Sequence, residues 1–334
     1  MPSRSFFLPP DQLANAAVLA EANPPERHDE IMRLASRGIA PLVDEVSLAE
    51  LVGVTPSLIF SILIRKDKHY RSFCLPKANG STRIINSPRT YLKVIHWFIL
   101  DNILSKVKNN DCVTAFISGR GPYFNAQMHS GAHHIFQTDL EEFFPSIKVQ
   151  NVYRMWLSIG YNQEVAEQLS NLVTYRGELP QGAPTSPAIS NIVAGNLDKR
   201  LLKLAYEYGY KYTRYADDIT FSSKERIPLE FADAVNEQIV LGGFIESRRK
   251  RRFKGFGAAM NVTGLNINDF PQPPREWRKR TRALFHRAKL DAAFAKENRG
   301  KIAGSLGVLH AAGLPSQHPL ILNGKEALLN SKNY

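Results

Sequence analysis

Two adjacent aspartates divide the segment 210–223, YKYTRYADDITFSS, into two runs in which polar and apolar residues alternate. Such alternation on both sides of a short polar break predicts an antiparallel hairpin with Asp217 and Asp218 at its turn. Neighbouring carboxylates repel each other, so their presence needs a reason. An aspartate-rich turn, an acid–base pair and a divalent-cation site are the three candidates.

A third acidic residue favours the cation site. Asp139 stands at the end of another predicted strand, in HIFQTDLEEFFPS. Two strands that end in carboxylates predict a site for two Mg²⁺ ions about 3.5–4 Å apart. Such a pair activates an attacking hydroxyl and stabilises the leaving oxygen in phosphoryl or nucleotidyl transfer.

The charge is concentrated at one end of the chain. Of the net charge of +12, all comes from residues 241–334, which hold 18 Lys and Arg against 6 Asp and Glu, while residues 1–240 hold 25 of each. A basic end on a neutral body indicates a polyanionic partner, most simply nucleic acid. The alternative is a solvated basic surface without a partner.

Composition excludes several other classes. The sequence has no apolar run of the roughly 18–20 residues that span a bilayer, which predicts no membrane partner. Prolines and an aspartate interrupt the first apolar stretch, which argues against a signal peptide. Two cysteines, Cys74 and Cys112, form no metal or disulfide pattern. We therefore expect a cytoplasmic protein.

The order of predicted elements indicates an α+β fold. Residues 1–60 resemble short amphipathic helices. HYRSFCLPKANGSTRIINSP then predicts a hairpin with its turn at Asn79-Gly80. Helices interrupted by non-adjacent strands follow, which favours an α+β body over a doubly wound sheet.

Three motifs in a fixed order resemble the reverse transcriptases. They are TDLEEFFPSI, LPQGAPTSP and TRYADDITFS, the last with the Tyr-x-Asp-Asp signature. The resemblance implies a right-hand polymerase with fingers, palm and thumb, an antiparallel palm sheet, and a helical N-terminal extension and thumb. The implied organisation is an extension over 1–60, fingers and palm over 61–265, and a basic helical thumb over 266–334.

The resemblance also implies the metal ligands. Asp139 and Asp217 are the expected main ligands of two Mg²⁺ ions, the Leu140 carbonyl assists, and Asp218 supports. The family usually carries a lysine that protonates pyrophosphate. Here Arg249 occupies the apparent position with Lys250 beside it. Because arginine is a poor proton donor, the general acid stays unassigned.

Further residues are expected to hold the incoming deoxynucleoside triphosphate (dNTP). Phe144 matches the steric gate that excludes a 2′-hydroxyl; its alternative is a core aromatic. Gln181 and Gly182 are expected against the nucleotide and the template. Lys77 and Arg83 are placed to hold the triphosphate, because Arg grips phosphate oxygens bidentately. A solvated hairpin charge is the alternative for both.

Two short elements resemble those of bacterial retron reverse transcriptases. They are NAQMH, from Asn125 to His129, and VTGLNIN, which begins with Val262, Thr263 and Gly264. The resemblance implies that both regions bind structured RNA. The alternatives are a loop or core histidine for His129 and an ordinary strand end with a glycine turn for Val262–Gly264.

A basic helix is predicted over residues 274–297. One face of it is apolar, with Trp277, Leu284, Ala288 and Ala295. Cations recur every seven residues on a neighbouring face and suit the phosphates of a nucleic acid duplex: Arg275, Arg282, Lys289 and Lys296. A merely solvated face is the alternative.

The sequence thus predicts a retron-type RNA-directed DNA polymerase. By resemblance, it copies part of its cognate noncoding RNA into single-stranded DNA from an RNA 2′-hydroxyl, giving a branched RNA–DNA molecule. The same resemblance implies a bacterial cytoplasm, phage defence, a nearby-encoded effector protein and template removal by host RNase H. The alternatives are an intron-encoded (group II) or abortive-infection reverse transcriptase, or a non-catalytic RNA-binding scaffold.

Overall fold

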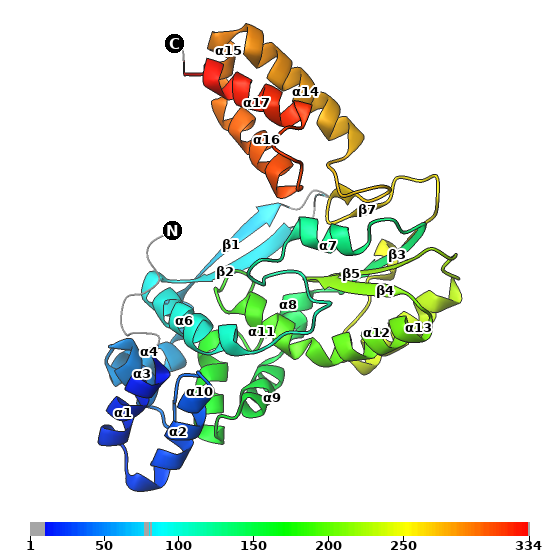
Figure 1. Cartoon of the computed structure of the whole chain (residues 1–334). Helices are drawn as coiled ribbons and strands as arrows, with labels where there is room; N and C mark the ends of the chain where they lie inside the picture. The colour runs from blue at the N-terminus through cyan, green and yellow to red at the C-terminus, as the bar shows by residue number, and fades with distance from the viewer. Residues whose placement is uncertain (1–10, 77–79, 81, 333–334) are drawn as a thin grey trace. The chain divides into compact units, whose positions relative to one another are not determined.

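The computed structural model describes residues 11–76, 80 and 82–332. Figure 1 shows the ribbon of the whole chain. The chain divides into two compact units, one of Met1–Asn110 with Glu141–Asn196 and the other of Asp111–Leu140 with Leu197–Tyr334. Within the described residues, no helix has the length and apolar character needed to cross a membrane. The predicted boundaries at residues 60 and 265 stay predictions.

The first unit is mainly helical. Its only strands among the described residues, β1 (Tyr70–Pro76) and β2 (Thr82–Pro88), pair antiparallel from Tyr70 opposite Pro88 to Pro76 opposite Thr82. This register confirms the predicted hairpin; Asn79 of its turn lies outside the described residues. The helices are α1 (Gln12–Ala22), α2 (His28–Ser36), α3 (Ser47–Val52), α4 (Pro56–Ile64), α5 (Lys66–His69), α6 (Thr90–Asn102), α8 (Phe143–Ser146), α9 (Val149–Ile159), α10 (Gln163–Val173) and α11 (Ser186–Val193).

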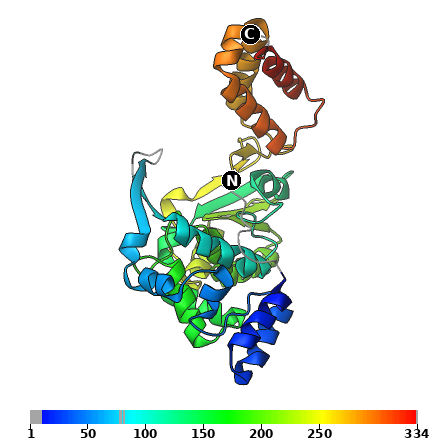
Figure 2. The ribbon, with the colours of Figure 1, turned by 90° about the vertical axis from the view of Figure 1, so that its left-hand side faces the viewer.

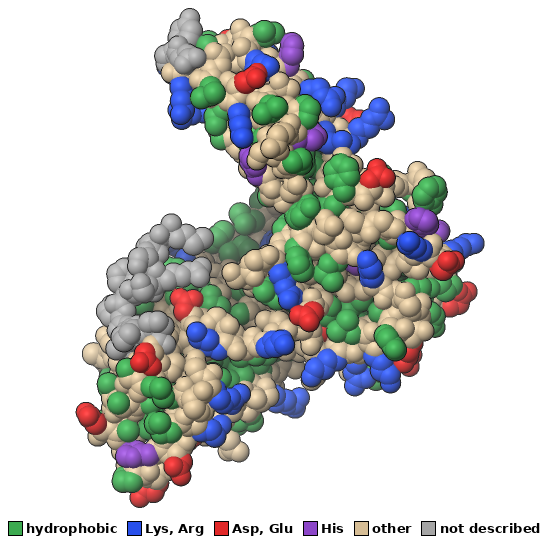
Figure 3. Space-filling model, viewed as in Figure 1, with side chains coloured by type: hydrophobic (Ala, Val, Ile, Leu, Met, Phe, Trp, Pro, Cys, Tyr) green, Lys and Arg blue, Asp and Glu red, His purple; other side chains and the backbone are tan. Residues whose placement is uncertain are grey.

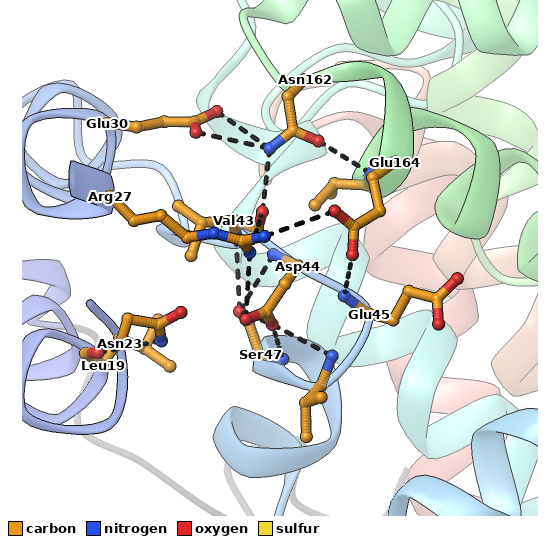
Figure 4. A network of polar contacts seen from close by, with 12 residues as sticks. Leu19, Asn23, Arg27, Glu30, Val43, Asp44, Glu45, Ser47, Asn162 and Glu164 are labelled. Atoms are coloured by element: carbon orange, nitrogen blue, oxygen red, sulfur yellow. Dashed lines mark hydrogen bonds and ion pairs between the residues drawn. The ribbon is translucent and has the colours of Figure 1, made fainter.

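Polar contacts fasten the N-terminal helices to the rest of this unit (Figure 4). The Arg27 guanidinium lies 3.1 Å from Asp44 and 3.6 Å from Glu164 at the start of α10. Asn162, which caps α10, donates to the Val43 carbonyl at 2.9 Å. Because the contacts made by Glu164 and Asn162 join residues more than 100 positions apart, the N-terminal helices are an integral layer of this unit.

An antiparallel sheet organises the second unit. Its strand order is β4 (Lys211–Tyr215), β5 (Asp218–Ser223), β3 (His134–Asp139) and β6 (Arg252–Lys254). Phe136 on β3 and Phe221 on β5 both pack edge-to-face on Phe231 of α13 (Glu230–Leu241). Helices α7 (Pro122–Met128) and α12 (Gly195–Glu207) complete the region. This confirms the predicted α+β class with an antiparallel palm sheet.

The last described residues form a helical bundle (Figure 2). Its helices are α14 (Arg275–Leu290), α15 (Ala292–Glu297), α16 (Arg299–Ala311) and α17 (Pro319–Asn330). The prediction of one continuous helix over 274–297 is wrong, because the structure has two helices there. Asp291 breaks it, since its backbone is extended and its side chain accepts from the Phe294 amide to cap α15.

The predicted apolar face of that segment packs into the bundle core. Ala288 and Ala295 are fully buried, and Trp277 and Leu284 pack against the core from its edge. Phe285 is fully buried beside them. The periodicity therefore located the inward face, although Phe285 was not included in the prediction.

Candidate active site

The sheet brings the three aspartates together. Asp139, the last residue of β3, pairs with Asp218, the first residue of β5. Asp218 also pairs with Tyr215 across the hairpin, and Ala216 and Asp217 form the turn between them. The Leu140 amide donates to the Asp217 carbonyl at 3.1 Å, which continues the strand pairing past Asp139. The turn and the end of β3 are therefore joined through their backbones.

Burial and mutual repulsion raise the pKa values of the two aspartates in the hairpin. Burial and the charge of Asp139 raise the pKa of Asp217. For Asp218, the largest cause of the raised pKa is desolvation by the surrounding protein. The charge of Asp217 and a hydrogen bond with Asp139 follow. Together they raise the pKa of Asp218 to about 7, although this side chain keeps contact with solvent. Excess negative charge is gathered here without enough positive charge to balance it.

One cation lies on the cluster. The Lys250 Nζ is 2.7 Å from an Asp139 carboxylate oxygen. In the sequence, Arg249 occupies the apparent position of the family lysine with Lys250 beside it, and the general acid is unassigned. The structure places the Lys250 ammonium against Asp139. Lys250 is the last residue of a short 3₁₀ turn, Arg248–Lys250. The residue before this turn, Ser247, donates its amide to the Asp139 carbonyl at 2.7 Å.

A buried carboxylate anchors the segment that carries Lys250. Glu246 accepts from the Thr138 hydroxyl at 2.7 Å and from Arg251 at 2.9 and 2.7 Å. Thr138 precedes Asp139 on β3, so this contact sets the 246–251 segment against the strand end. Glu246 was not predicted from the sequence, because its partners lie over 100 residues upstream or within a run of basic residues.

The donor set is chemically suited to a divalent cation, although no closed cage is formed. Among the described residues, no three His, Cys, Asp or Glu side chains are arranged to hold a metal ion by themselves. Mg²⁺ usually takes one or two carboxylates and completes its shell with water and substrate phosphates. Clustered, partly desolvated carboxylates with raised pKa values match that kind of open site.

The raised pKa of Asp218 predicts an unusual pH dependence of stability in metal-free protein. The unfolded value is about 3.9 and the folded value about 7, so the folded state binds more protons between them. Stability from this group is thus present at low pH and is lost as pH rises through about 7. Urea unfolding in EDTA should show the wild type losing stability relative to Asp218→Asn between pH 5 and pH 8. A difference between the two proteins that stays constant with pH would contradict the assignment.

The expected nucleotide-binding residues that the structure describes lie in the first unit. The Asn86 amide on β2 donates to the Gln181 carbonyl at 2.7 Å, which joins the hairpin to the LPQGAPTSP loop. Arg83 is exposed on β2, and Phe144 is half-buried in α8 with its ring 5.6 Å from that of Phe143. Lys77 lies outside the described residues. Their nucleotide contacts remain predictions.

Gly182 is required by close packing. Its φ is +114°, and a Cβ there would lie 2.7 Å from the Ile85 Cγ2 and 3.3 Å from the Asn86 carbonyl oxygen. Gly177 in the same unit also has positive φ (+77°), but a Cβ there meets nothing within 4 Å. Gly177 is therefore a control for positive φ in the same unit, whereas Gly182 combines a φ further from the left-handed region with steric conflict.

We expect Gly182→Ala to lower the free energy of unfolding more than Gly177→Ala does. The control carries only the cost of a left-handed alanine, about 1 kcal/mol. Gly182→Ala adds overpacking, about 1–3 kcal/mol. Urea denaturation of both variants measures the difference. Equal losses would mean that the loop and hairpin are not held in the contact described.

The side chains of Asn125 and His129, which the resemblance places in an RNA-binding region, belong to the core. The RNA-binding role of that region stays a prediction. Asn125 Oδ1 accepts from the hydroxyls of Thr114 and Thr213 at 3.0 and 2.6 Å. The two ring nitrogens of His129 lie 2.7 Å from the Ser222 and Thr213 hydroxyls. Burial lowers the pKa of His129 to about 3, so the ring is neutral. Both side chains are fully enclosed and bonded to protein, so they offer no surface for direct RNA contact.

The VTGLNIN element forms a small hairpin. Thr263 and Gly264 join β7 (Asn261–Val262) to β8 (Leu265–Asn266), with φ values of +47° and +81°. Val262 is buried, whereas Gly264 is exposed and Thr263 donates to the Pro122 carbonyl at 2.7 Å. Within this element, the turn rather than Val262 is accessible to a partner.

The four predicted cations of the basic segment are all exposed, but they do not share one helix. Arg275, Arg282 and Lys289 lie on α14, whereas Lys296 lies on α15 beyond the break at Asp291. Lys289 forms an ion pair with Glu326 on α17. Figure 3 shows Lys and Arg side chains gathered along the edge of the bundle where α14 runs. Arg275 and Arg282 are therefore the better candidates for phosphate contacts.

A family match and two relatives support the same class, the reverse transcriptases. Residues 75–240 match the family described as Reverse transcriptase (RNA-dependent DNA polymerase). The chain is 34% identical to Retron Mx65 reverse transcriptase of Myxococcus xanthus, over 76% of this chain and 65% of that protein. It is 30% identical to Retron Ec86 reverse transcriptase of Escherichia coli, over 76% of this chain and 81% of that protein. A telomerase structure from Candida albicans matches 78% of this chain and 59% of that one at 8% identity, with a TM-score of 0.46.

The antiparallel sheet, with its aspartate hairpin opposite the end of β3, defines the class as a reverse transcriptase with the right-hand polymerase fold. Within that class, the chain belongs to the retron reverse transcriptases, as its match to the Escherichia coli protein shows. Its match spans 65% of the Mx65 protein and 61% of Retron Mx162 reverse transcriptase, which is just under two thirds of each.

Proposed function

We propose that the protein is an RNA-directed DNA polymerase that copies part of its own structured noncoding RNA. The observation that carries this proposal is the pairing of Asp139 with Asp218, which sets one carboxylate opposite two others at a strand end. A non-catalytic scaffold would have no need to gather three repelling charges. The retron relatives favour a retron product over those of intron-encoded enzymes.

The carboxylates of Asp139 and Asp217 and the carbonyl of Leu140 would hold two Mg²⁺ ions, with Asp218 in support. Bound there, the ions would activate the attacking hydroxyl and neutralise charge on the leaving pyrophosphate. The hydroxyl oxygen bonds to the α-phosphorus of the dNTP as the bond to pyrophosphate breaks. Arg83 and Lys77 would hold the triphosphate, Gln181 and Gly182 the base pair, and Phe144 would exclude a 2′-hydroxyl.

The retron assignment gives the product its form. We propose that synthesis starts from a guanosine 2′-hydroxyl of the cognate RNA, so that RNA and DNA stay joined at a branch. Host RNase H would remove the copied template. The proposed setting is phage defence in the bacterial cytoplasm, together with an effector protein encoded nearby.

The helical bundle provides a further prediction, on the salt dependence of RNA binding. Replacing Arg275 and Arg282 with Gln should flatten the log–log slope of affinity against salt by about one unit for each phosphate that the variant no longer binds. The matched control is Lys203→Gln, because Lys203 on α12 is highly exposed and lies outside the bundle. Filter binding from about 50 to 200 mM salt measures the slopes. If the slope of the Arg275 and Arg282 variant equals that of the Lys203→Gln control, the basic face is only solvated.

The proposed function is tested by sequencing the nucleic acid that copurifies with the protein. The gene is expressed with its flanking genomic DNA, and the bound species are treated with ribonuclease and with a debranching enzyme. We expect one DNA sequence, complementary to a transcript from the flanking DNA and linked to it by a 2′,5′ branch. Untemplated DNA or intron RNA would instead indicate another kind of reverse transcriptase.

A further inference from the structure

A fully buried ion pair lies next to the aspartate hairpin. The Arg214 guanidinium and the Asp198 carboxylate are both inaccessible to solvent. They are joined by two hydrogen bonds of 2.7 Å, from Nε to Oδ1 and from Nη2 to Oδ2. The Tyr212 hydroxyl donates to the same Oδ1 at 2.8 Å. Removing two charges from water is costly and often contributes little net stability, so such a pair calls for a role beyond stability.

The guanidinium also bonds to the active-site turn. Arg214 Nη1 donates to the Ala216 carbonyl oxygen at 3.0 Å. Ala216 immediately precedes Asp217 and has a φ of +57°. A left-handed alanine is disfavoured and persists only where its surroundings hold it. The bond from Arg214 is a direct restraint on that residue.

Arg214 is itself held firmly. Its amide donates to the Cys112 carbonyl, and its carbonyl accepts from the Thr114 amide, each at 2.9 Å. Asp198, on α12, fixes the far end of the side chain. An arginine can make all three side-chain bonds at once because its donors form a rigid planar fork, whereas the single ammonium of lysine cannot reproduce that geometry.

We propose that Arg214 is a positioning residue for the active site. Clamped by Asp198, it holds the Ala216 carbonyl and thereby fixes the turn that presents Asp217 and Asp218 opposite Asp139. Tyr212 serves as the internal comparison, because its hydroxyl bonds Asp198 without contacting the turn. The kinetic consequence rests on the proposed polymerase function, whereas the effect on the turn does not.

The test combines hydrogen exchange across the turn with the rate of single-nucleotide incorporation. In Arg214→Lys, we expect the amides of residues 216–218 to exchange at least about tenfold faster. Misplacement of the carboxylates should lower kcat about 10- to 100-fold, with RNA affinity and the KM for dNTP little changed. In Tyr212→Phe, turn exchange and kcat should both stay within about twofold of the wild type.

A second variant separates positioning from stability. Replacing the buried group with apolar side chains, as Arg214→Met, Asp198→Leu and Tyr212→Phe together, often preserves or increases stability. This folded variant should still show the fast-exchanging turn and the lower kcat. If it keeps wild-type protection and kcat, the inference is overturned, even where Arg214→Lys alone fails to fold. An inactive wild type would refute the polymerase proposal instead, and turn exchange would still decide the inference.

Discussion

Asp217→Asn should abolish DNA synthesis while RNA binding persists. The substitution keeps the size of the side chain and its place in the turn, but it removes the charge that would hold a divalent cation. Metal-ion catalysis supplies several kcal/mol of transition-state stabilisation, so we expect incorporation to fall at least about a thousandfold. RNA affinity should change by less than about twofold. A carboxylate does not attract the phosphates of RNA, so its loss removes no favourable contact with the RNA.

The matched control for this variant is Asp269→Asn. Asp269 lies exposed in the same unit, so it loses the same charge away from the hairpin. Primer extension and RNA binding, measured on both proteins, separate the local effect from the general one. Comparable activity of the two variants, or parallel loss of RNA binding in Asp217→Asn, would remove Asp217 from the proposed metal site.

Phe144→Ala should admit ribonucleotides. If the half-buried ring closes the space that a 2′-hydroxyl would occupy, its loss opens that space without altering the carboxylates. An apolar pocket rejects an added hydroxyl by about a hundredfold, so the preference for dNTP over NTP should fall by about that factor. The measurement is kcat/KM for each nucleotide on one template.

Phe144→Tyr is the control for the gate, because it retains the ring and should keep sugar selection near the wild-type value. The dNTP reaction itself should survive Phe144→Ala, which distinguishes a gate from a core residue. Unchanged sugar selection, together with a marked loss of stability, would favour the core alternative. Phe143, the neighbouring ring, is already buried in the core of its unit.

The strands that carry the aspartates could be predicted from the sequence because their signals are local. Alternation around Asp217 and Asp218 predicted the hairpin, and the strand before Asp139 predicted a second carboxylate at a strand end. The register that sets Asp139 against Asp218 joins strands from distant parts of the chain, and only the structure supplies it. The fingers hairpin was equally local, since two alternating runs flank a turn signal.

Features that depend on distant partners could not be predicted. His129 looked like a contact residue in a short motif, and only folding reveals that the Thr213 and Ser222 hydroxyls enclose it. Arg214 was not singled out in the sequence, because its partner Asp198 lies on a helix 16 residues earlier. The contact between Lys250 and Asp139 depends on the path of a short 3₁₀ turn. The break at Asp291, by contrast, had a signal, as aspartate is a common helix cap.

Diffraction from crystals of the protein soaked with Mn²⁺ and a non-hydrolysable dNTP tests the central claim most directly, because anomalous scattering locates the manganese. We predict manganese within about 2.0–2.4 Å of carboxylate oxygens of both Asp139 and Asp217, with triphosphate oxygens completing the shell. In Asp217→Asn crystals that peak should weaken or vanish. Manganese bound only through the triphosphate, with Asp139 and Asp217 left uncoordinated, would contradict the account.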